Sequence, residues 1–315
     1  MKLRKLGNSG IEVGSLALGG NVFGWTADEP TSFAILNGFI AAGFNLIDTA
    51  DMYSVWVPGH QGGESETIIG KWLARNGRRS QVVIATKVGM ELTPSDKGLS
   101  KPYILRAVER SLQRLQTDYI DLYQSHLDDE SIPLAETLSA YDQLIKQGKV
   151  RAIGASNYTG SRLSEALRTS REKGYPRYEC LQPHYNLCER QPFEKDLEPV
   201  CREAGLAVIP YFSLAAGFLT GKYRSEQDLS KSPRGQGLKK YLNERGFRIL
   251  AAVDQVASRL GSTPGKVALA WLMSCPSVTA PIASATSLAQ LTELIDATRL
   301  QLDREAVLLL NQASV

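Results

Sequence analysis

The sequence is poor in residues that bind metals or form disulfides. It contains four cysteines and three histidines in 315 residues. They are Cys180, Cys188, Cys201 and Cys275, and His60, His126 and His184. No two cysteines form a CxxC pair, and the histidines lie far from the spacing of metal ligands. We therefore expect no metal site, and we expect free, mostly buried thiols of the kind found in a reducing compartment.

Long apolar runs and basic patches are also absent. The basic residues within 1–10 are not followed by an apolar run, and no other segment is long and apolar enough to cross a bilayer. The net charge is +3, and lysines and arginines are interspersed with acids rather than gathered in a basic strip. These features predict a cytoplasmic protein that binds neither membranes nor nucleic acids. They do not indicate an oligomeric state.

The sequence also lacks the glycine-rich motifs that bind nucleotides in other folds. The GxGxxG fingerprint of a doubly wound dinucleotide-binding sheet does not occur, which argues against that architecture. The nearest match to a phosphate-binding P-loop is residues 261–266, but this segment is one residue short and is followed by Val267 instead of Ser or Thr. We interpret it as the start of a helix with Pro264 in its first turn.

What the sequence does contain is a regular alternation of short apolar runs with amphipathic stretches. This alternation is typical of parallel βαβ units. Eight units can be counted, and short apolar strands are expected where both faces of a sheet are buried. The expected strands are residues 16–18, 44–47, 82–86, 120–124, 150–154, 180–183, 207–210 and 279–282. The expected helices are residues 31–42, 64–75, 101–115, 134–147, 161–172, 193–204, 263–274 and 287–297.

The sequence therefore predicts an α/β protein, a (β/α)8 TIM barrel. Two helices are left over, 244–260 and 304–313, and a turn at 7–10 suggests an N-terminal hairpin. No low-complexity or Pro/Ser-rich linker marks a boundary, and barrels of this length commonly form one unit. We expect a single domain over residues 1–315.

Polar residues follow three successive expected strands, where a barrel collects its active site. Asp48 and Tyr53 follow the second strand, Lys87 the third and His126 the fourth. Singly, each has a simpler explanation as a cap, a solvated charge or a satisfied core histidine. Together they form a coherent set, because a phenol is a poor acid near neutrality unless a nearby cation stabilises its phenolate.

At these residues the sequence resembles the aldo-keto reductases. The family's Asp, Tyr, Lys and His correspond to Asp48, Tyr53, Lys87 and His126, in the contexts 45–50, 84–87 and 121–126. The resemblance runs from the Gly19-Gly20 segment to the last expected helix. It implies hydride transfer from NADPH, with NADH as a possible substitute, to the carbonyl carbon of an aldehyde or ketone. Tyr53 would then protonate the carbonyl oxygen, and His126 would hydrogen-bond it.

The resemblance also implies a set of cofactor contacts. Ser156, Asn157 and Gln182 match the residues that hold the nicotinamide carboxamide, and Tyr211 matches the ring that stacks on the nicotinamide. Residues of the loop after the seventh strand match the segment that folds over the pyrophosphate: Phe212, Ser213, Leu214, Gly217, Lys222 and Arg234. The family's Ser-Pro-Leu is Phe-Ser-Leu in this chain.

The segment expected at the adenosine 2′-phosphate departs from many relatives. It contains Ser284 and Thr286, with Gln290 further along the helix, where relatives place Arg or Lys. Hydroxyls and a helix N-terminus can bind phosphate, but they favour NADPH over NADH less strongly than a charged side chain does.

Large apolar side chains occur on the loops after the first three strands. They are Phe23, Trp25, Trp56 and Met90. They either anchor these loops or line an apolar pocket for the carbonyl substrate.

Two other classes of function remain open from the sequence. Some relatives bind the nicotinamide cofactor and act mainly as channel-associated subunits, so a regulatory role is one alternative. A barrel hydrolase that uses paired carboxylates such as Asp48 and Glu64 is another. Lys87 fits the hydrolase poorly, since a cation beside a buried carboxylate lowers its pKa and makes it a worse acid.

Overall fold

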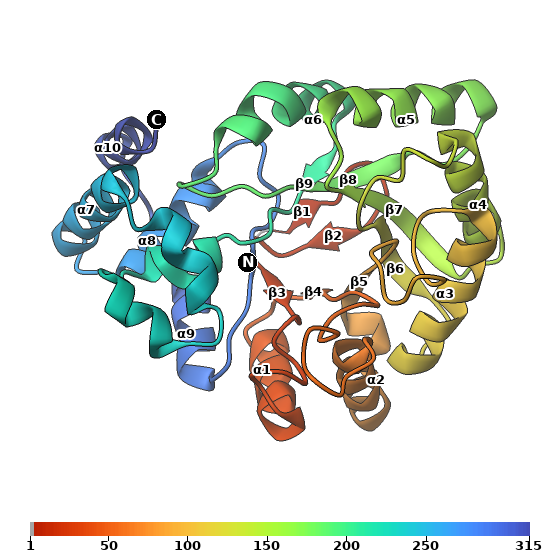
Figure 1. Ribbon diagram of the computed structural model, residues 1–315, viewed down its shortest axis with the longest axis horizontal. Coiled ribbons are helices and arrows are strands. Elements are labelled where there is room, and N and C mark those ends of the chain that lie inside the picture. Colours follow the sequence, from red (N-terminus) through yellow and green to blue (C-terminus); the bar gives the residue numbers. More distant parts are fainter. Residues whose placement is uncertain (1–2) are drawn as a thin grey trace.

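Eight short strands alternate with helices along the chain and form one parallel sheet. The computed structural model describes residues 3–315 (Figure 1). In their order of pairing, the strands are β10 (Ile282–Ala283), β3 (Ala17–Gly19), β4 (Leu46–Asp48), β5 (Val83–Val88), β6 (Ile120–Ser125), β7 (Val150–Ser156), β8 (Tyr178–Gln182) and β9 (Ala207–Val208). All seven pairings in this order are parallel.

The sheet closes on itself between its first and last members. The backbone N–H groups of Thr279 and Ile282, at and just before β10, donate to the carbonyls of Val208 and Pro210 at distances of 2.8 and 2.9 Å. These bonds join β10 to β9, so the eight strands form a barrel without a free edge. The predicted (β/α)8 fold is confirmed.

Helices surround this barrel. Eight of them follow the strands: α1 (Glu29–Ala41), α2 (Glu64–Asn76), α3 (Lys101–Leu115), α4 (Leu134–Lys146), α5 (Gly160–Lys173), α6 (Glu198–Ala204), α8 (Pro264–Ser274) and α9 (Leu288–Ala297). The two predicted additional helices are α7 (Glu244–Arg259) and α10 (Arg304–Ala313), which pack against each other. In Figure 1 they lie together at one side of the barrel, with the C-terminus beside α10.

An antiparallel hairpin closes the bottom of the barrel. It consists of β1 (Arg4–Lys5) and β2 (Glu12–Val13), as predicted from the turn between them. Its apolar residues Leu6, Ile11 and Val13 belong to the same buried cluster as the inward-facing residues of the strands. The opposite end, where the strands terminate, is left for the polar residues described below.

Two helix starts differ from the predictions by more than one residue or in the type of helix. α1 begins at Glu29, two residues early, because Asp28 caps it by accepting a hydrogen bond from the N–H of Thr31. The helix predicted at 193–204 begins as a π-helical turn, Phe193–Leu197, and continues as α6. Pro199 has no N–H to donate to the carbonyl four residues earlier, which accounts for the wider turn.

Three of the four thiols are buried and all four are free, as predicted. The longest helix in residues 3–315 is α7 with 16 residues, and no helix of this part of the chain meets the length and hydropathy that a membrane span needs.

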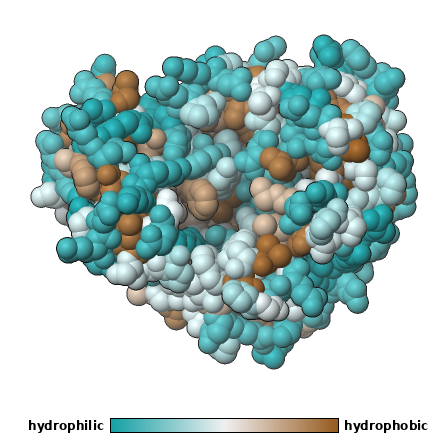
Figure 2. All heavy atoms as spheres, viewed as in Figure 1, coloured by the Kyte–Doolittle hydropathy of each residue, from teal (hydrophilic) through white to brown (hydrophobic). Residues whose placement is uncertain are grey.

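Figure 2 shows one face of the molecule. Hydrophilic residues cover most of its rim, and the surface is hollowed near its centre, where hydrophobic residues gather. A concave, partly apolar surface of this kind is typical of a small-molecule site.

Candidate active site

The polar residues predicted to act together lie at the carboxyl ends of neighbouring strands. Side chains of a strand alternate between its two faces. Leu46 belongs to the cluster inside the barrel, so Asp48, two residues later on β4, faces the same way. Ala85 and Lys87 have the same relation on β5. The period of a strand thus brings an acid and a cation into the barrel mouth.

The ammonium group of Lys87 is the centre of the site. Its Nζ lies 2.7 Å from Oδ2 of Asp48, 2.8 Å from the carbonyl oxygen of Thr49 and 2.8 Å from the hydroxyl oxygen of Tyr53. An ammonium has three protons, so each is directed to one acceptor. Lys87 is fully buried, and these three contacts fix its position.

The pKa of Tyr53 lies well above that of a free phenol. Burial is the main cause, and the negative charge of Asp48, whose Oδ2 is 3.4 Å from the hydroxyl, adds to it. The sequence analysis expected a nearby cation to stabilise the phenolate, and Lys87 lies at the distance this role requires. In the resting site, the raised pKa means that Tyr53 carries its proton near neutral pH.

His126 lies beside Tyr53, with ring centroids 6.0 Å apart and the rings nearly perpendicular. Burial, and then the charge of Lys87, holds the pKa of His126 well below that of free histidine. Its ring is therefore neutral near pH 7. It can donate a hydrogen bond through one N–H but does not supply a mobile proton.

Two glutamines complete the ring around Asp48. Gln182, at the end of β8, donates from Nε2 to Oδ1 of Asp48 at 2.9 Å and contacts Oε1 of Gln124 at 3.3 Å. Gln124, at the end of β6, was missed as a site residue. Its position in the sequence could have indicated that it faces into the barrel, since it lies two residues after the inward-facing Leu122.

The ends of β7 and β8 place further predicted residues on the same rim. Ser156 donates to the carbonyl of Gln182 at 2.8 Å, and Asn157 donates to the carbonyl of His126 at 2.8 Å. The hydroxyl of Tyr211 donates to Oδ1 of Asn157, also at 2.8 Å, and the Tyr211 ring stacks on His184. These residues therefore form one hydrogen-bonded arc beside Asp48, Tyr53, Lys87 and His126, which we call the tetrad.

Comparison with known proteins identifies the family of this arrangement. A model of the aldo/keto reductase family matches residues 14–314. The chain is 36% identical to the uncharacterized oxidoreductase YrpG of Bacillus subtilis (99% of this chain, 95% of YrpG). It is 33% identical to the aldo-keto reductase YhdN of Bacillus subtilis (97% and 91%). It is also 32% identical to a probable voltage-gated potassium channel subunit beta of Arabidopsis thaliana (93% and 90%). The chain belongs to the aldo/keto reductase family.

This aldo/keto reductase is accordingly an oxidoreductase that acts on carbonyl compounds with NAD(P)H. The resemblance and enzyme class predicted from the sequence are confirmed. The hydrolase alternative finds no support in the site, because Asp48 is held in an ion pair with Lys87 and is not paired with a second carboxylate.

The loop after β9 has an unusual backbone. Phe212, Ala215, Ala216 and Gly217 all have positive φ, between 48° and 103°. Sequence reasoning named Phe212 and Gly217 but missed the two alanines. Successive residues that include the left-handed conformation turn backbone N–H groups to one side, and such concave arrays bind anions.

Two cations stand along this loop. Lys222 is exposed, and Arg234 is half-buried, with its guanidinium 5.2 Å from the centre of the Trp25 ring. Within residues 3–315, neither side chain forms an ion pair with a carboxylate. The other two predicted loop residues are less accessible: Ser213 is buried and donates to the carbonyl of Pro210, and Leu214 is half-buried.

The segment after β10 has its hydroxyls already engaged. Ser284 donates to Oδ1 of Asn21 at 2.6 Å, and Thr286 donates from both its N–H and its hydroxyl to Oε1 of Gln290. Ser287 caps α9 by accepting from the N–H of Gln290. A ligand at this point would have to replace the Gln290 side chain on Thr286.

The apolar residues near the tetrad fall into two groups. Trp56 is 43% exposed, and its ring contacts those of Trp25 and Tyr53 at centroid distances of 5.5 and 6.1 Å. Met90 is half-buried. Phe23 is fully buried and packs in the core beneath this surface. Leu127, directly after His126, is 45% exposed and was missed by the sequence reasoning.

The buried ion pair generates a test of stability. Lys87→Met leaves the Asp48 carboxylate buried without its cation, and we expect a loss of about 3–5 kcal/mol in the free energy of unfolding. The double variant Asp48→Asn/Lys87→Met removes both charges and should recover much of that loss. Urea unfolding followed by tryptophan fluorescence gives both values. A loss below about 1 kcal/mol for the single variant, the range of an exposed pair, would contradict this account of the site.

Proposed function

We propose that this aldo/keto reductase reduces an aldehyde or ketone to the alcohol with Tyr53 as the general acid. The observation that carries the proposal is the contact between Lys87 and the hydroxyl of Tyr53 at 2.8 Å, within a buried ion pair. Lys87 donates to this oxygen, and the phenol proton makes only a long contact of 3.4 Å with Oδ2 of Asp48, so it can turn to another acceptor. The raised pKa keeps that proton in place at neutral pH.

Each of the other three residues has a role that follows from its contacts. Lys87 stabilises the phenolate that forms as the proton leaves, and Asp48 holds Lys87 in place. His126, kept neutral by burial, donates a hydrogen bond to the carbonyl oxygen. General acid assistance of this kind contributes about 10²- to 10⁴-fold to a rate.

The cofactor, when bound, supplies hydride to the carbonyl carbon. The arc of Ser156, Asn157 and Gln182 offers amide and hydroxyl groups to the nicotinamide carboxamide, and Tyr211 offers a ring face. The left-handed loop fits a pyrophosphate, because its backbone N–H groups and the unpaired cations are complementary to an anion. We assign this role to Phe212, Ser213, Leu214, Gly217, Lys222 and Arg234.

NADPH is the proposed cofactor, with a modest preference over NADH. Thr286 and Ser284, with Gln290 moved aside, would meet the 2′-phosphate near the N-terminus of α9. Neutral hydroxyls bind phosphate more weakly than an Arg does, and here they must first give up existing hydrogen bonds. Both facts limit the preference.

The substrate is proposed to be an apolar carbonyl compound. Trp25, Trp56 and Met90 would line its pocket, since all three remain at least partly accessible and the Trp56 ring contacts those of Tyr53 and Trp25. Leu127 extends the same surface beyond His126. Phe23 is proposed to support the pocket from below, because its side chain is fully enclosed by protein.

A regulatory role is the second candidate. It is favoured by the similarity to the probable potassium channel subunit of Arabidopsis thaliana. The complete tetrad in this chain favours catalysis over a purely regulatory role.

A substrate screen tests the proposed function directly. Purified protein would be mixed with NADPH or NADH and a panel of aldehydes, ketones and oxidised sugars, and cofactor oxidation would be followed by absorbance. We expect turnover with apolar carbonyl compounds. Tight cofactor binding without turnover of any carbonyl compound would favour the regulatory role instead.

Tyr53→Phe removes one hydroxyl and keeps the aromatic ring. With the best substrate of the screen, we expect the rate to fall by about 10²-fold or more, because no other group donates the proton. NADPH affinity, measured by fluorescence quenching, should stay close to that of the wild type. Tyr103→Phe is the matched control, since Tyr103 is a buried tyrosine of α3, outside both the tetrad and the loop after β9. Retention of most of the activity in Tyr53→Phe would exclude this residue as the acid.

Thr286→Arg tests the 2′-phosphate site. A charge-assisted bond to phosphate should tighten NADPH binding roughly tenfold and leave NADH binding nearly unchanged. Dissociation constants for both cofactors, measured by fluorescence quenching, provide the comparison. Thr292→Arg adds the same charge further along α9 and serves as the control. Equal wild-type affinities for NADH and NADPH, or no gain in Thr286→Arg, would move the site toward Lys222 or Arg234.

A further inference from the structure

Asn186 is a buried asparagine whose side chain joins two segments of the chain. It lies in the turn between β8 and α6 and is fully buried. Its Oδ1 accepts hydrogen bonds from the backbone N–H groups of Cys188 and Glu189 at 2.8 and 3.1 Å. Its Nδ2 donates to the carbonyl oxygen of Phe212 at 2.9 Å. The acceptor thus fixes its own turn, and the donor holds the loop after β9.

The carbonyl that Asn186 holds belongs to a residue in an unfavourable conformation. Phe212 has a φ of 52°, and a non-glycine residue rarely adopts positive φ unless its surroundings impose it. The same carbonyl accepts from the N–H of Ala215 at 2.7 Å, at the start of the left-handed run 215–217. The hydrogen bond from Asn186 therefore holds the residue at which the loop first adopts the left-handed conformation.

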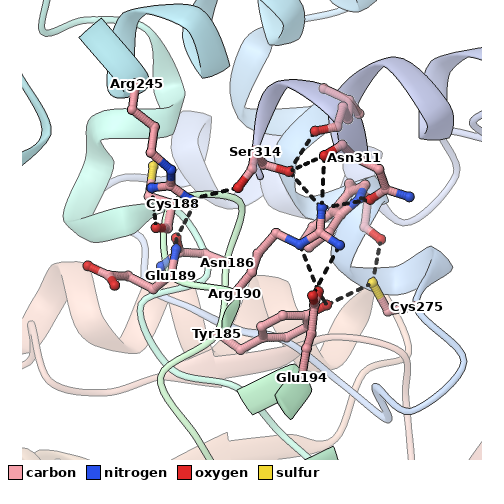
Figure 3. Close-up of polar contacts among 12 residues, drawn as sticks. Tyr185, Asn186, Cys188, Glu189, Arg190, Glu194, Arg245, Cys275, Asn311 and Ser314 are labelled. Atoms are coloured by element: carbon pink, nitrogen blue, oxygen red, sulfur yellow. Dashed lines mark hydrogen bonds and ion pairs between the residues drawn. The ribbon is translucent and has the colours of Figure 1, made fainter. Parts of the chain in front are cut away.

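The Asn186 turn is itself fixed from its other side. Arg245 donates to the carbonyls of Cys188 and Ser314 at 2.8 and 2.7 Å. Arg190 forms an ion pair with Glu194 at 2.7 Å and donates to Ser314 at 2.7 Å. Figure 3 shows Arg190 of the turn and Arg245 of α7 converging on Ser314 near the end of the chain. A turn held by two arginines is a rigid support for the loop.

We propose that Asn186 is a positioning residue for the cofactor: its Nδ2 donor holds Phe212 in the left-handed conformation that shapes the loop for the pyrophosphate. The role rests on the proposed function, which assigns this loop to the cofactor. Asn186 does not touch the reacting atoms. Its contribution should appear in cofactor affinity and not in the rate of the saturated enzyme.

Asn186→Asp separates the two halves of the side chain. A carboxylate still accepts from the N–H groups of Cys188 and Glu189 but cannot donate to Phe212. We expect the Kd for NADPH to rise about tenfold, the effect of losing one buried hydrogen bond, while kcat at saturating cofactor changes much less. Asn186→Ser is a second variant without the added charge, since serine can accept within the same turn but is too short to reach Phe212.

Asn45→Asp is the matched control. Asn45 makes the same kind of contacts at the opposite end of the barrel, donating to the carbonyl of Glu12 at 2.9 Å and accepting from the N–H of Gly14 at 3.0 Å. Asp at this position should affect the melting temperature and leave the Kd for NADPH unchanged. A general loss of stability is thereby distinguished from a loss of loop position.

A double-variant comparison tests the mechanism at Phe212. Glycine adopts positive φ without strain, whereas alanine does not. Asn186→Asp should therefore raise the Kd in the Phe212→Ala background as it does in the wild type, and by a smaller factor in the Phe212→Gly background. Equal factors in both backgrounds would overturn the proposal.

Different results would contradict the positioning role of Asn186 and the proposed function on which it rests. If wild-type protein binds neither NADPH nor NADH in the quenching assay, the proposed function fails and the role of Asn186 falls with it. If the wild type binds NADPH and both Asn186 variants bind it equally well, the positioning role alone is overturned. A rise in Kd confined to the Asn186 variants, with Asn45→Asp unchanged, supports it.

Discussion

The buried ammonium of Lys87 organises the site. A lone charge within a barrel mouth would be costly to remove from water, and it is tolerated here because Asp48, the Thr49 carbonyl and the Tyr53 hydroxyl accept its three protons. These acceptors fix the positions of the strand end and of the loop that follows it. Burial lowers the pKa of His126, and the same charge lowers it further, so the ring is neutral. One cation thus positions the hydroxyl of the proposed acid, contributes to the state of its neighbour and ties two strands together.

Much of this site could be predicted because strand period and barrel geometry are simple. Each short apolar run places every second side chain inside the barrel. A polar residue that lies an even number of positions after an inward-facing residue therefore also faces inward, and such residues converge at one end of the barrel. Asp48, Lys87 and His126 follow this rule. Gln124 obeys it equally well, but an amide has no acid or base chemistry of its own, so the sequence alone does not mark it as a site residue.

Other features depended on contacts that no local pattern reveals. Phe23 has the character of a pocket residue, but packing between the loop and the core decides that it is buried. The pKa of Tyr53 is raised by burial and then by the charge of Asp48, and residue spacing alone does not reveal how deeply the hydroxyl is buried. The bond from Asn186 to Phe212 joins residues 26 positions apart and has no sequence signature.

The backbone shows where this fold departs from regular geometry. Six non-glycine residues of the described chain have positive φ, and Gln116 alone among them is simply the end of a helix. The other five are Ser54, Asn157, Phe212, Ala215 and Ala216. Ser54 follows the proposed acid Tyr53, Asn157 lies in the arc beside the tetrad, and the last three belong to the loop after β9. Strained conformations persist only where surrounding contacts over-determine them. Their gathering at one end of the barrel means that hydrogen bonds such as those of Asn157 and Asn186 fix this rim in the structure without a ligand. If the proposed binding groups lie there, this order reduces the ordering cost of binding.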